Sequence, residues 1–360
     1  MRLLDLSIRA PGRVVLFGEH QDYLGLPVIP AAIDLYMTIS GKKHENPYYR
    51  IDLPDLKKKE EFNSFNIQYL GDRDRDYLRA GVKVLQEENI IPYNKGVVAV
   101  ITSDIPIQAG LSSSSALNVV WIQFLAELFG TELDPLSLTK LAHKAEVLEF
   151  QEPGGMQDHM VIAHGYLNYE EFEPIKCTRL REKLPGIVIG NSKDRKDTLN
   201  TLRTIKAAVK TGLAYLERSN VKDLKEQDIT ELNNSYSSLD RFSTNALKAA
   251  FTNYKITQLA YKEFLKADLN QLKIGKLLLK HHVSLREFLD VSTPKIEKLI
   301  QAATNAGALG CKITGSGNGG CMIAYCPGNE IKVKKAIELN GGEAHIAQVV
   351  PGVGTNKIRG

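Results

Sequence analysis

One segment joins an apolar stretch to an amphipathic one through a glycine and four consecutive serines: Pro106-Ile107-Gln108-Ala109-Gly110-Leu111-Ser112-Ser113-Ser114-Ser115-Ala116-Leu117. The apolar residues 97–102 before it predict a buried strand, and the apolar periodicity over residues 117–128 predicts a helix that stops at Gly130. Such a turn points backbone N–H groups and hydroxyls at one place, beside the partial positive charge of the helix N-terminus. We therefore predict a phosphate-binding loop and call residues 110–115 the serine loop.

The alternative is that these serines only cap the helix that follows them. One serine is enough for an N-cap, so four exceed what capping requires. The segment is not a Walker A loop, because no Gly-Lys-Ser/Thr follows at the required spacing.

A second glycine-rich segment, residues 315–320, formally matches G-x-G-x-x-G. A dinucleotide-binding loop needs a helix directly after it, whereas strand-like residues 321–326 follow here. No ribose-binding acid stands at the expected distance either. A dehydrogenase is therefore disfavoured, and the segment is predicted to let backbone approach a ligand or the facing domain.

The composition is typical of a globular chain of two domains. It has 360 residues, 43% of them hydrophobic, and a net charge of +4 from dispersed basic residues, which argues against nucleic acid as a partner. Two runs of mixed charge, residues 57–61 and 72–76, are predicted to be solvated surface. No signal peptide, membrane-spanning run or C-x-x-C spacing occurs, so we expect a cytoplasmic protein without membrane contact or disulfides.

The N-terminal segment places a polar cluster between apolar strands. Residues 4–17 predict two strands joined by a turn at Pro11-Gly12. Glu19, His20 and Asp22 follow within four residues and can all bond hydroxyl groups. A polar surface loop is the alternative, but a cluster held between buried strands is the better candidate for a binding site.

Two further carboxylates lie near a helix predicted over residues 136–150. Glu146, close to the end of that helix, opposes the helix dipole and therefore needs a cation or solvent. Asp158 follows Gly154-Gly155 and precedes the apolar residues 160–163, so its alternative role is to cap the next segment.

The second half of the chain is richer in helix, and we place the domain boundary near residue 180, giving domains of residues 1–180 and 181–360. The predicted helices cover residues 197–216, 222–234, 241–264, 269–288, 293–306 and 331–338, and the predicted strands cover residues 184–190, 308–314, 321–326 and 344–350.

Three motifs together resemble the GHMP kinases, the family of galactokinase, homoserine kinase, mevalonate kinase and phosphomevalonate kinase. They are Pro11-Gly12-Arg13-Val14 with Gly18-Glu19-His20, the segment 106–116, and Lys312-Ile313-Thr314-Gly315-Ser316-Gly317 with Gly320. Their order and spacing agree along nearly the whole chain. The resemblance implies an α/β fold with an N-terminal domain like ribosomal protein S5 domain 2, a ferredoxin-like C-terminal domain with added helices, and ATP and Mg²⁺ as cofactors.

Within this family the chain most resembles the galactokinases. Glu19-His20-Gln21-Asp22-Tyr23 is similar to their sugar-binding signature, and Gly155-x-x-Asp158 is similar to the segment of their catalytic aspartate. The resemblance implies that Arg13 and Asp158 flank the attacking hydroxyl. It further implies sugar binding by Glu19, His20, Asp22, Tyr23 and Gly155, nucleotide binding by Pro106, Gly110, Leu111, Ser112, Ser113, Ser114 and Ser115, and Mg²⁺ binding by Glu146 with Ser114 or Ser115.

The activity implied is ATP-dependent phosphorylation of a monosaccharide, a small-molecule partner, at its anomeric hydroxyl by a monomer or homodimer. Two alternatives stay open. One is a mevalonate kinase-like activity, because Val14-Val15-Leu16-Phe17 is also similar to mevalonate kinases; the other is a non-catalytic sugar sensor. The tyrosine that galactokinases place early in the second domain has no counterpart in residues 196–203.

Overall fold

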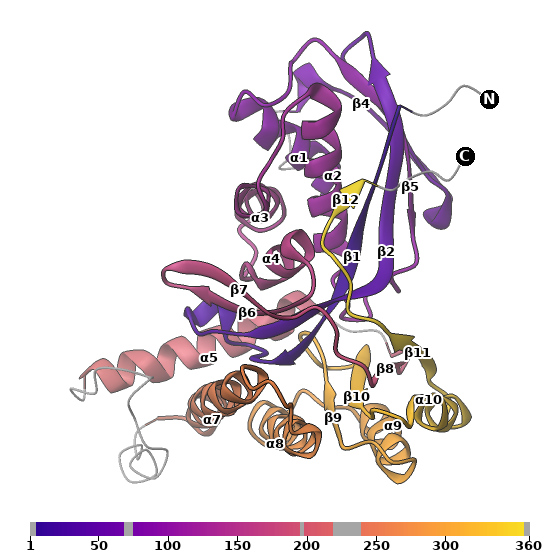
Figure 1. Ribbon diagram of the computed structural model, residues 1–360. Helices are drawn as coiled ribbons and strands as arrows, with labels where there is room; N and C mark the ends of the chain where they lie inside the picture. Colours follow the sequence, from indigo (N-terminus) through magenta and orange to yellow (C-terminus); the bar gives the residue numbers. More distant parts are fainter. Residues whose placement is uncertain (1–4, 68–74, 195–197, 219–238, 356–360) are drawn as a thin grey trace.

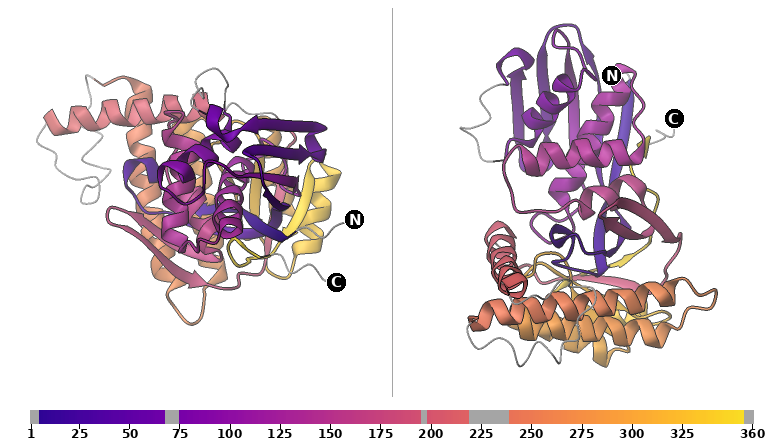
Figure 2. Two further views of the ribbon diagram at one scale, coloured as in Figure 1. Left: turned by 90° about the horizontal axis from the view of Figure 1, so that it is seen from above. Right: turned by 90° about the vertical axis from the view of Figure 1, so that its left-hand side faces the viewer.

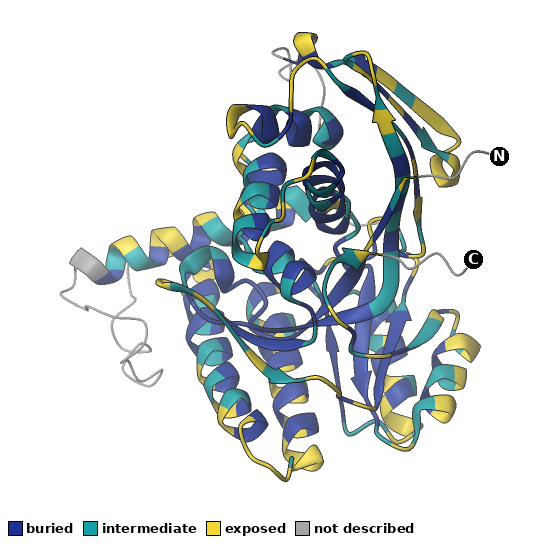
Figure 3. Ribbon diagram, turned by 45° about the horizontal axis from the view of Figure 1, so that its top comes forward, coloured by how far each residue is buried: buried dark blue, intermediate teal, exposed yellow. Residues whose placement is uncertain are grey.

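The computed structural model describes residues 5–67, 75–194, 198–218 and 239–355, and these form two lobes, each built around one β-sheet (Figure 1). The right-hand view of Figure 2 shows the lobes one above the other, with the helices of the second lobe at the base. The strands at the centre are buried, and the exposed residues lie on the outer faces of the helices and at the sheet ends (Figure 3).

The first sheet runs in the order β12-β1-β2-β5-β3-β4, with β6 beside β2 and β7 beside β6. Among the described strands only the β3–β5 pairing is parallel. The strands are β1 (Leu6–Phe17), β2 (Ile29–His44), β3 (Tyr48–Leu53), β4 (Lys58–Asn63), β5 (Gly96–Ser103), β6 (Leu167–Phe172), β7 (Ile175–Arg181) and β12 (Gly354–Thr355). The helices of this lobe are α1 (Tyr77–Glu87), α2 (Ser113–Phe129), α3 (Pro135–His143) and α4 (Gln157–His164), with short turns η1 (Asp22–Leu24), η2 (Pro54–Leu56), η3 (Ser64–Asn66) and η5 (Lys144–Leu148).

The central helix of the first lobe is α2, as the apolar periodicity predicted. It is apolar around most of its circumference because it packs on β1 and β2 and is surrounded by α1, α3 and α4 (Figure 1). Trp121 is fully buried on it and donates its indole N–H to the carbonyl of Leu78 at 2.9 Å. Gly130, with φ of 92°, ends the helix in the left-handed conformation expected of a C-terminal glycine.

One local prediction for this lobe was wrong and another was incomplete. Pro11 and Gly12 do not turn the chain, since β1 continues through them and a bulge against β2 absorbs the irregularity between these two residues. The helix predicted over residues 136–150 ends as an α-helix at His143 and continues as the π-helical turn η5, where the Glu149 N–H bonds the Lys144 carbonyl at 3.0 Å. Single π-helical turns are frequent at functional sites.

The second sheet runs β11-β8-β10-β9, and every pairing in it is antiparallel. With helices between β8 and β9 and between β10 and β11, this is the ferredoxin-like order, so the predicted two-domain fold is confirmed. The elements are β8 (Ile187–Asn191), α5 (Thr198–Arg218), α7 (Arg241–Phe264), α8 (Gln271–Leu289), α9 (Pro294–Asn305), β9 (Gly310–Ile313), β10 (Cys321–Tyr325), α10 (Glu330–Leu339) and β11 (Glu343–Ala347). The helix predicted over residues 222–234 lies outside the described residues.

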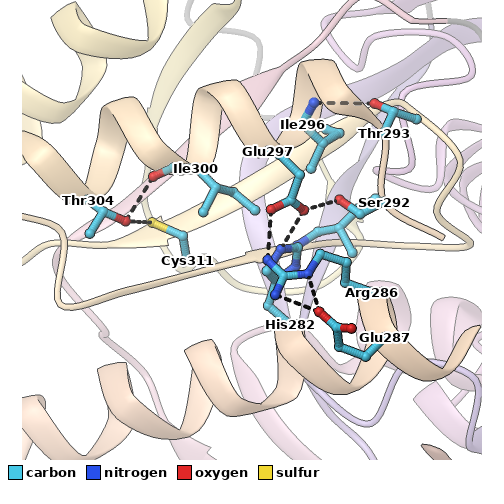
Figure 4. A network of polar contacts seen from close by, with 11 residues as sticks. His282, Arg286, Glu287, Ser292, Thr293, Ile296, Glu297, Ile300, Thr304 and Cys311 are labelled. Carbon is cyan, nitrogen blue, oxygen red and sulfur yellow. Dashed lines mark hydrogen bonds and ion pairs between the residues drawn. The ribbon is translucent and has the colours of Figure 1, made fainter. Parts of the chain in front are cut away.

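A polar network centred on Glu297 fixes α8, α9 and β9 to one another (Figure 4). The Glu297 carboxylate accepts hydrogen bonds from His282, Arg286 and Ser292 at 2.9, 3.1 and 2.5 Å. The other ring nitrogen of His282 accepts the N–H of Ile313 at 3.4 Å. The network thereby holds the strand from which Lys312 reaches the first lobe.

The chain crosses between the lobes more than once. β7 ends at Arg181 in the first sheet and β8 starts the second, close to the proposed boundary at residue 180. After β11, however, the chain returns to the first lobe, where β12 pairs with β1 through Ile8 and Thr355. The division into residues 1–180 and 181–360 stays a prediction, and the residues after β11 join the sheet of the first lobe.

Candidate active site

A cavity of about 410 Å³ lies where the two lobes meet, a size typical of small-molecule sites. Its lining comes from all three motif segments: the β1 end and the loop after it, the serine loop, and Gly315 with Ser316. The two lobes therefore bring together residues that lie up to 300 positions apart in the sequence.

Arg13 and Asp158 form a bidentate ion pair at the centre of this cavity. The Arg13 Nε and Nη2 atoms lie 2.6 and 2.7 Å from the two Asp158 oxygens, and Arg13 is 5% exposed. Burial alone would raise the pKa of Asp158, but the charge and hydrogen bonds of Arg13 outweigh it and hold that pKa below its usual range. Asp158 is the second residue of α4 and does not cap it, since the N-cap position belongs to Met156.

Alternate residues in the serine loop and just before it have a left-handed backbone. Gln108, Gly110 and Ser112 have φ of 56°, 85° and 60°, which folds the backbone tightly before α2 begins. The Ser112 hydroxyl makes no capping bond and instead donates to Asp158 at 2.5 Å, so the capping alternative is wrong for this serine. Arg13 donates to the carbonyl of Gly110 at 2.5 Å and ties the loop to β1.

The predicted nucleotide residues divide between two faces of the serine loop. Gly110 and Ser112, Ser113, Ser114 and Ser115 line the main cavity. Pro106 and Leu111 instead border a small apolar pocket on the other side of the loop, and Leu111 is 1% exposed. Their side chains therefore support the loop from behind.

Three of the predicted sugar-binding side chains face the same end of the cavity as Asp158. Burial, and next the charge of Asp158, raise the pKa of Asp22 to about 6. Glu19 is 1% exposed and pairs with the buried Lys312, and its Oε2 atom has no hydrogen-bond partner among the described residues. His20 is held at 3.1 Å by both the Tyr23 hydroxyl and the Ser316 carbonyl, which fixes Tyr23 at the cavity wall.

Glu146 lines the cavity from the π-helical turn η5. Its Oε2 atom lies 2.7 Å from Nε2 of His159, and both side chains are nearly buried. No cluster of three or more His, Cys, Asp or Glu side chains in the described ranges is arranged to hold a metal ion. Mg²⁺ bound with a nucleotide needs only one or two carboxylates, because phosphates and waters complete its shell, so Glu146 with Ser114 or Ser115 fits this ion.

Several lining residues were not found by sequence reasoning. Arg75 and residues 57–61 are mostly exposed, as predicted for the two charged runs, while residues 72–74 lie outside the described residues. Arg75 also lines the cavity and pairs with Glu152 at 3.0 Å. Thr198, Leu199 and Leu202 of α5 close the cavity where galactokinases were expected to place a tyrosine. No local pattern marks these residues, because their position depends on how α1 and α5 pack.

Five apolar side chains also line the cavity, and four of them lie outside the motifs. They are Met37, Leu53, Leu56, Ile101 and, within the segment 106–116, Ile107, and they come from β2, β3, η2, β5 and the segment before the serine loop. Apolar side chains next to the serine loop suit a nucleotide base.

None of the helices in the described part of the chain has the length and apolar character to span a membrane.

Comparison with known proteins places this site in a family. The GHMP kinases N terminal domain matches residues 76–166, the Galactokinase galactose-binding signature residues 5–43, and the GHMP kinases C terminal domain residues 261–342. The galactokinase of Lactococcus lactis, solved with galactose, superposes with a TM-score of 0.86 at 26% identity, covering 98% of this chain and 95% of that one.

Sequence relatives include mevalonate kinases as well as galactokinases. The mevalonate kinase of Thermococcus sibiricus is 31% identical over 94% of this chain and 95% of its own length. The galactokinase of Mannheimia succiniciproducens is 26% identical over 94% of this chain and 90% of its own. The motifs thus resemble those of galactokinases, whereas the overall sequence identity is higher to the mevalonate kinase of Thermococcus sibiricus than to this galactokinase. The chain belongs to the GHMP kinase family and is an ATP-dependent phosphotransferase that acts on an alcohol group.

Proposed function

We propose that the chain transfers the γ-phosphoryl group of ATP to the anomeric hydroxyl of a neutral monosaccharide. The observation that carries this proposal is the charge of the acceptor end of the cavity, where Glu19, Asp22 and Asp158 supply three carboxylates. Carboxylates accept hydrogen bonds from sugar hydroxyls, whereas they repel the carboxylate that mevalonate carries at neutral pH.

Two cations near this end are already engaged by carboxylates of the protein. Arg13 is bound by both oxygens of Asp158 and by the Gly110 carbonyl. Lys312 is fully buried, pairs with Glu19 and donates to the Ile313 carbonyl at 2.9 Å. An acidic acceptor that bound Arg13 or Lys312 would have to break one of these pairs, whereas a neutral polyol would not. Lys206 is a further cation beside Tyr23, and its Nζ atom donates to the Pro153 carbonyl at 3.1 Å.

Asp158 is the proposed group that orients and deprotonates the sugar hydroxyl. Because Arg13 lowers its pKa, Asp158 is ionised at neutral pH but is a weak base. It therefore aligns the hydroxyl by accepting its hydrogen bond and takes the proton late, as the bond from the sugar oxygen to phosphorus forms. Phosphoryl transfer relies mainly on positioning and charge neutralisation, so a weak base suffices.

The serine loop and Glu146 form the proposed nucleotide end of the site. The backbone N–H groups of residues 113–115 are the unbonded donors at the α2 N-terminus and suit the triphosphate oxygens. Glu146 with Ser114 or Ser115 would hold Mg²⁺, which neutralises phosphate charge when bound. Arg75 lies at the rim of the same cavity with a partly exposed guanidinium, and we expect it to add positive charge there.

A mevalonate kinase activity is the second candidate, favoured by the 31% identity to the enzyme of Thermococcus sibiricus. The sensor alternative has no such support, since Arg13, Asp158, Glu146 and the serine loop are all present in one cavity.

Substrate screening separates the two activities. We would measure ADP release with Mg²⁺ and ATP against hexoses, pentoses, amino sugars and mevalonate, and locate the phosphate by phosphorus NMR. We expect turnover with a sugar and a phosphorus signal coupled to the anomeric proton. Turnover with mevalonate alone, or a phosphate on a primary hydroxyl, would contradict the proposal.

A further inference from the structure

We infer that His159 is a positioning residue that fixes the Glu146 carboxylate toward the nucleotide end of the cavity. The contact joins Nε2 of His159 to Oε2 of Glu146 at 2.7 Å, and the two side chains are 2% and 8% exposed. The inference rests on the proposed function, because it takes Glu146 as a ligand of Mg²⁺.

The arrangement follows from the position of His159 in α4. It directly follows Asp158, and successive residues of an α-helix point about 100° apart. Asp158 therefore faces Arg13 while His159 faces η5. One turn of α4 thus carries both Asp158, the proposed base, and His159, the partner of the proposed metal ligand Glu146. We infer that this turn sets the spacing between the acceptor and the nucleotide.

Glu146 needs such a partner because its carboxylate is buried. It stands in a π-helical turn and is 6% exposed, and a buried carboxylate needs a hydrogen-bond partner or a cation. His159 ties only one carboxylate oxygen, and Glu146 still lines the cavity, so the rest of the group can face a cation. Hydrogen-bonded partners of this kind orient metal ligands and tune their affinity.

His159 is itself held in place by packing. The His143 ring at the end of α3 lies edge-on against it, with ring centroids 5.5 Å apart and an interplanar angle of 84°. The Nδ1 atom of His159 is buried and makes no hydrogen bond among the described residues, so the contact with Glu146 is the polar anchor of the ring.

The test uses Mn²⁺ with the non-hydrolysable nucleotide AMP-PNP, which needs no acceptor sugar. We expect His159→Phe, which keeps a ring but loses the donor, to weaken Mn²⁺ binding by roughly 10–100-fold. His159→Gln, which can still donate to Glu146, should bind Mn²⁺ within a few-fold of the unmodified protein. The electron paramagnetic resonance spectrum of bound Mn²⁺ should change in the Phe variant and be restored in the Gln variant.

His164→Phe is the matched control. His164 lies on the same helix, and its ring bonds the Met160 carbonyl within α4 at 3.0 Å, so the Mn²⁺ affinity of this variant should stay unchanged. Thermal unfolding without metal checks that each variant is folded.

The variant Glu146→Gln tests the proposed metal site separately from the positioning role of His159. If it binds Mn²⁺·AMP-PNP like the unmodified protein, the proposed metal site is wrong and the inference falls with it. If Glu146→Gln weakens binding but His159→Phe does not, or strengthens it, only the positioning role of His159 is wrong.

Discussion

Gly155 approaches the carboxylate of Asp22 so closely that a Cβ atom built on Gly155 would stand 1.9 Å from Asp22 Oδ2. The glycine is not required by its backbone conformation, which lies outside the left-handed region. It is required by the approach itself, because the loop before Asp158 and the loop after β1 share one wall of the cavity. The acceptor site is therefore assembled from two loops that leave no room for a methyl group.

Gly155→Ala should weaken acceptor binding while it leaves nucleotide binding intact. The added methyl group must displace the Asp22 carboxylate, and a displaced buried acceptor loses about tenfold or more in affinity for the hydroxyl it binds. The acceptor KM and the affinity for AMP-PNP report the two ends separately. Gly154→Ala is the control, because its Cβ atom would meet only a Val147 methyl group at 3.5 Å. Equal effects of both substitutions would show that the Asp22 contact is not the cause.

Asp22 should impose a pH dependence on acceptor use. Burial, and next the charge of Asp158, raise its pKa to about 6, and only the ionised carboxylate offers all its lone pairs to sugar hydroxyls. We expect kcat/KM for the acceptor to rise with pH to a plateau above about 6. Asp22→Asn, which cannot ionise, should be less active and lose this inflection. An unchanged inflection in the Asn variant would assign it to another group.

The same group should lower stability at neutral pH. Because the folded pKa of about 6 lies above the ordinary value of 3.8, the folded protein holds the Asp22 proton more tightly than the unfolded chain does. The contribution of Asp22 to the free energy of unfolding is therefore greatest below pH 3.8 and falls as the pH rises to about 6. Asp22→Asn should unfold at a higher urea concentration than the unmodified protein at pH 7.5, with a smaller difference at pH 4.

The buried pair of Glu19 and Lys312 should contribute to the stability of the fold. Both side chains are buried between the lobes, so Lys312→Met leaves the Glu19 carboxylate without its cation, at a cost of about 3–5 kcal/mol in unfolding free energy. Urea unfolding measures this loss. The double variant Glu19→Gln with Lys312→Met should recover most of it, because no unpaired charge is then buried.

Lys334→Met is the control for that substitution. Lys334 pairs with Glu338 at 3.9 Å on the surface, where both side chains are more than 40% exposed, so its loss should change stability by less than about 1 kcal/mol. If Lys312→Met also changed the free energy of unfolding by less than about 1 kcal/mol, the pair of Glu19 and Lys312 would not hold the two lobes together.

The sequence predicted those parts of the fold that local patterns encode. The spacing of apolar residues identified α2 and its glycine stop, and the alternation of helices and strands after residue 180 matched the ferredoxin-like sheet. It failed at Pro11-Gly12, because a bulge in a long pair of strands leaves the same local signal as a turn. It also missed β12, whose two residues carry no pattern and pair with β1 only through the tertiary fold.

In the candidate site, too, the residues of short motifs were predictable and the contacts that depend on tertiary packing were not. Arg13, Asp158 and the serine loop belong to short motifs, and the structure brings them into contact. The partner of Ser112 was not predictable, because it depends on a left-handed backbone that turns the hydroxyl away from the helix. Arg75 was assigned to the surface and is exposed there, but its additional place in the cavity lining depends on tertiary packing and could not be predicted.

Asp158→Asn should lower turnover while the acceptor still binds, and it should also change the pKa of the neighbouring Asp22. Loss of a positioned proton acceptor lowers kcat by roughly 10²–10⁴-fold, while the acceptor still finds Glu19 and Asp22. The charge of Asp158 is the second cause, after burial, of the raised pKa of Asp22, so removing it should move the pH inflection in acceptor affinity below 6. Calorimetric titration of the acceptor between pH 4.5 and 8 (in roughly half-unit steps) measures that shift. A variant with nearly full kcat would remove Asp158 from the mechanism, and an inflection still at 6 would show that burial alone sets the pKa of Asp22.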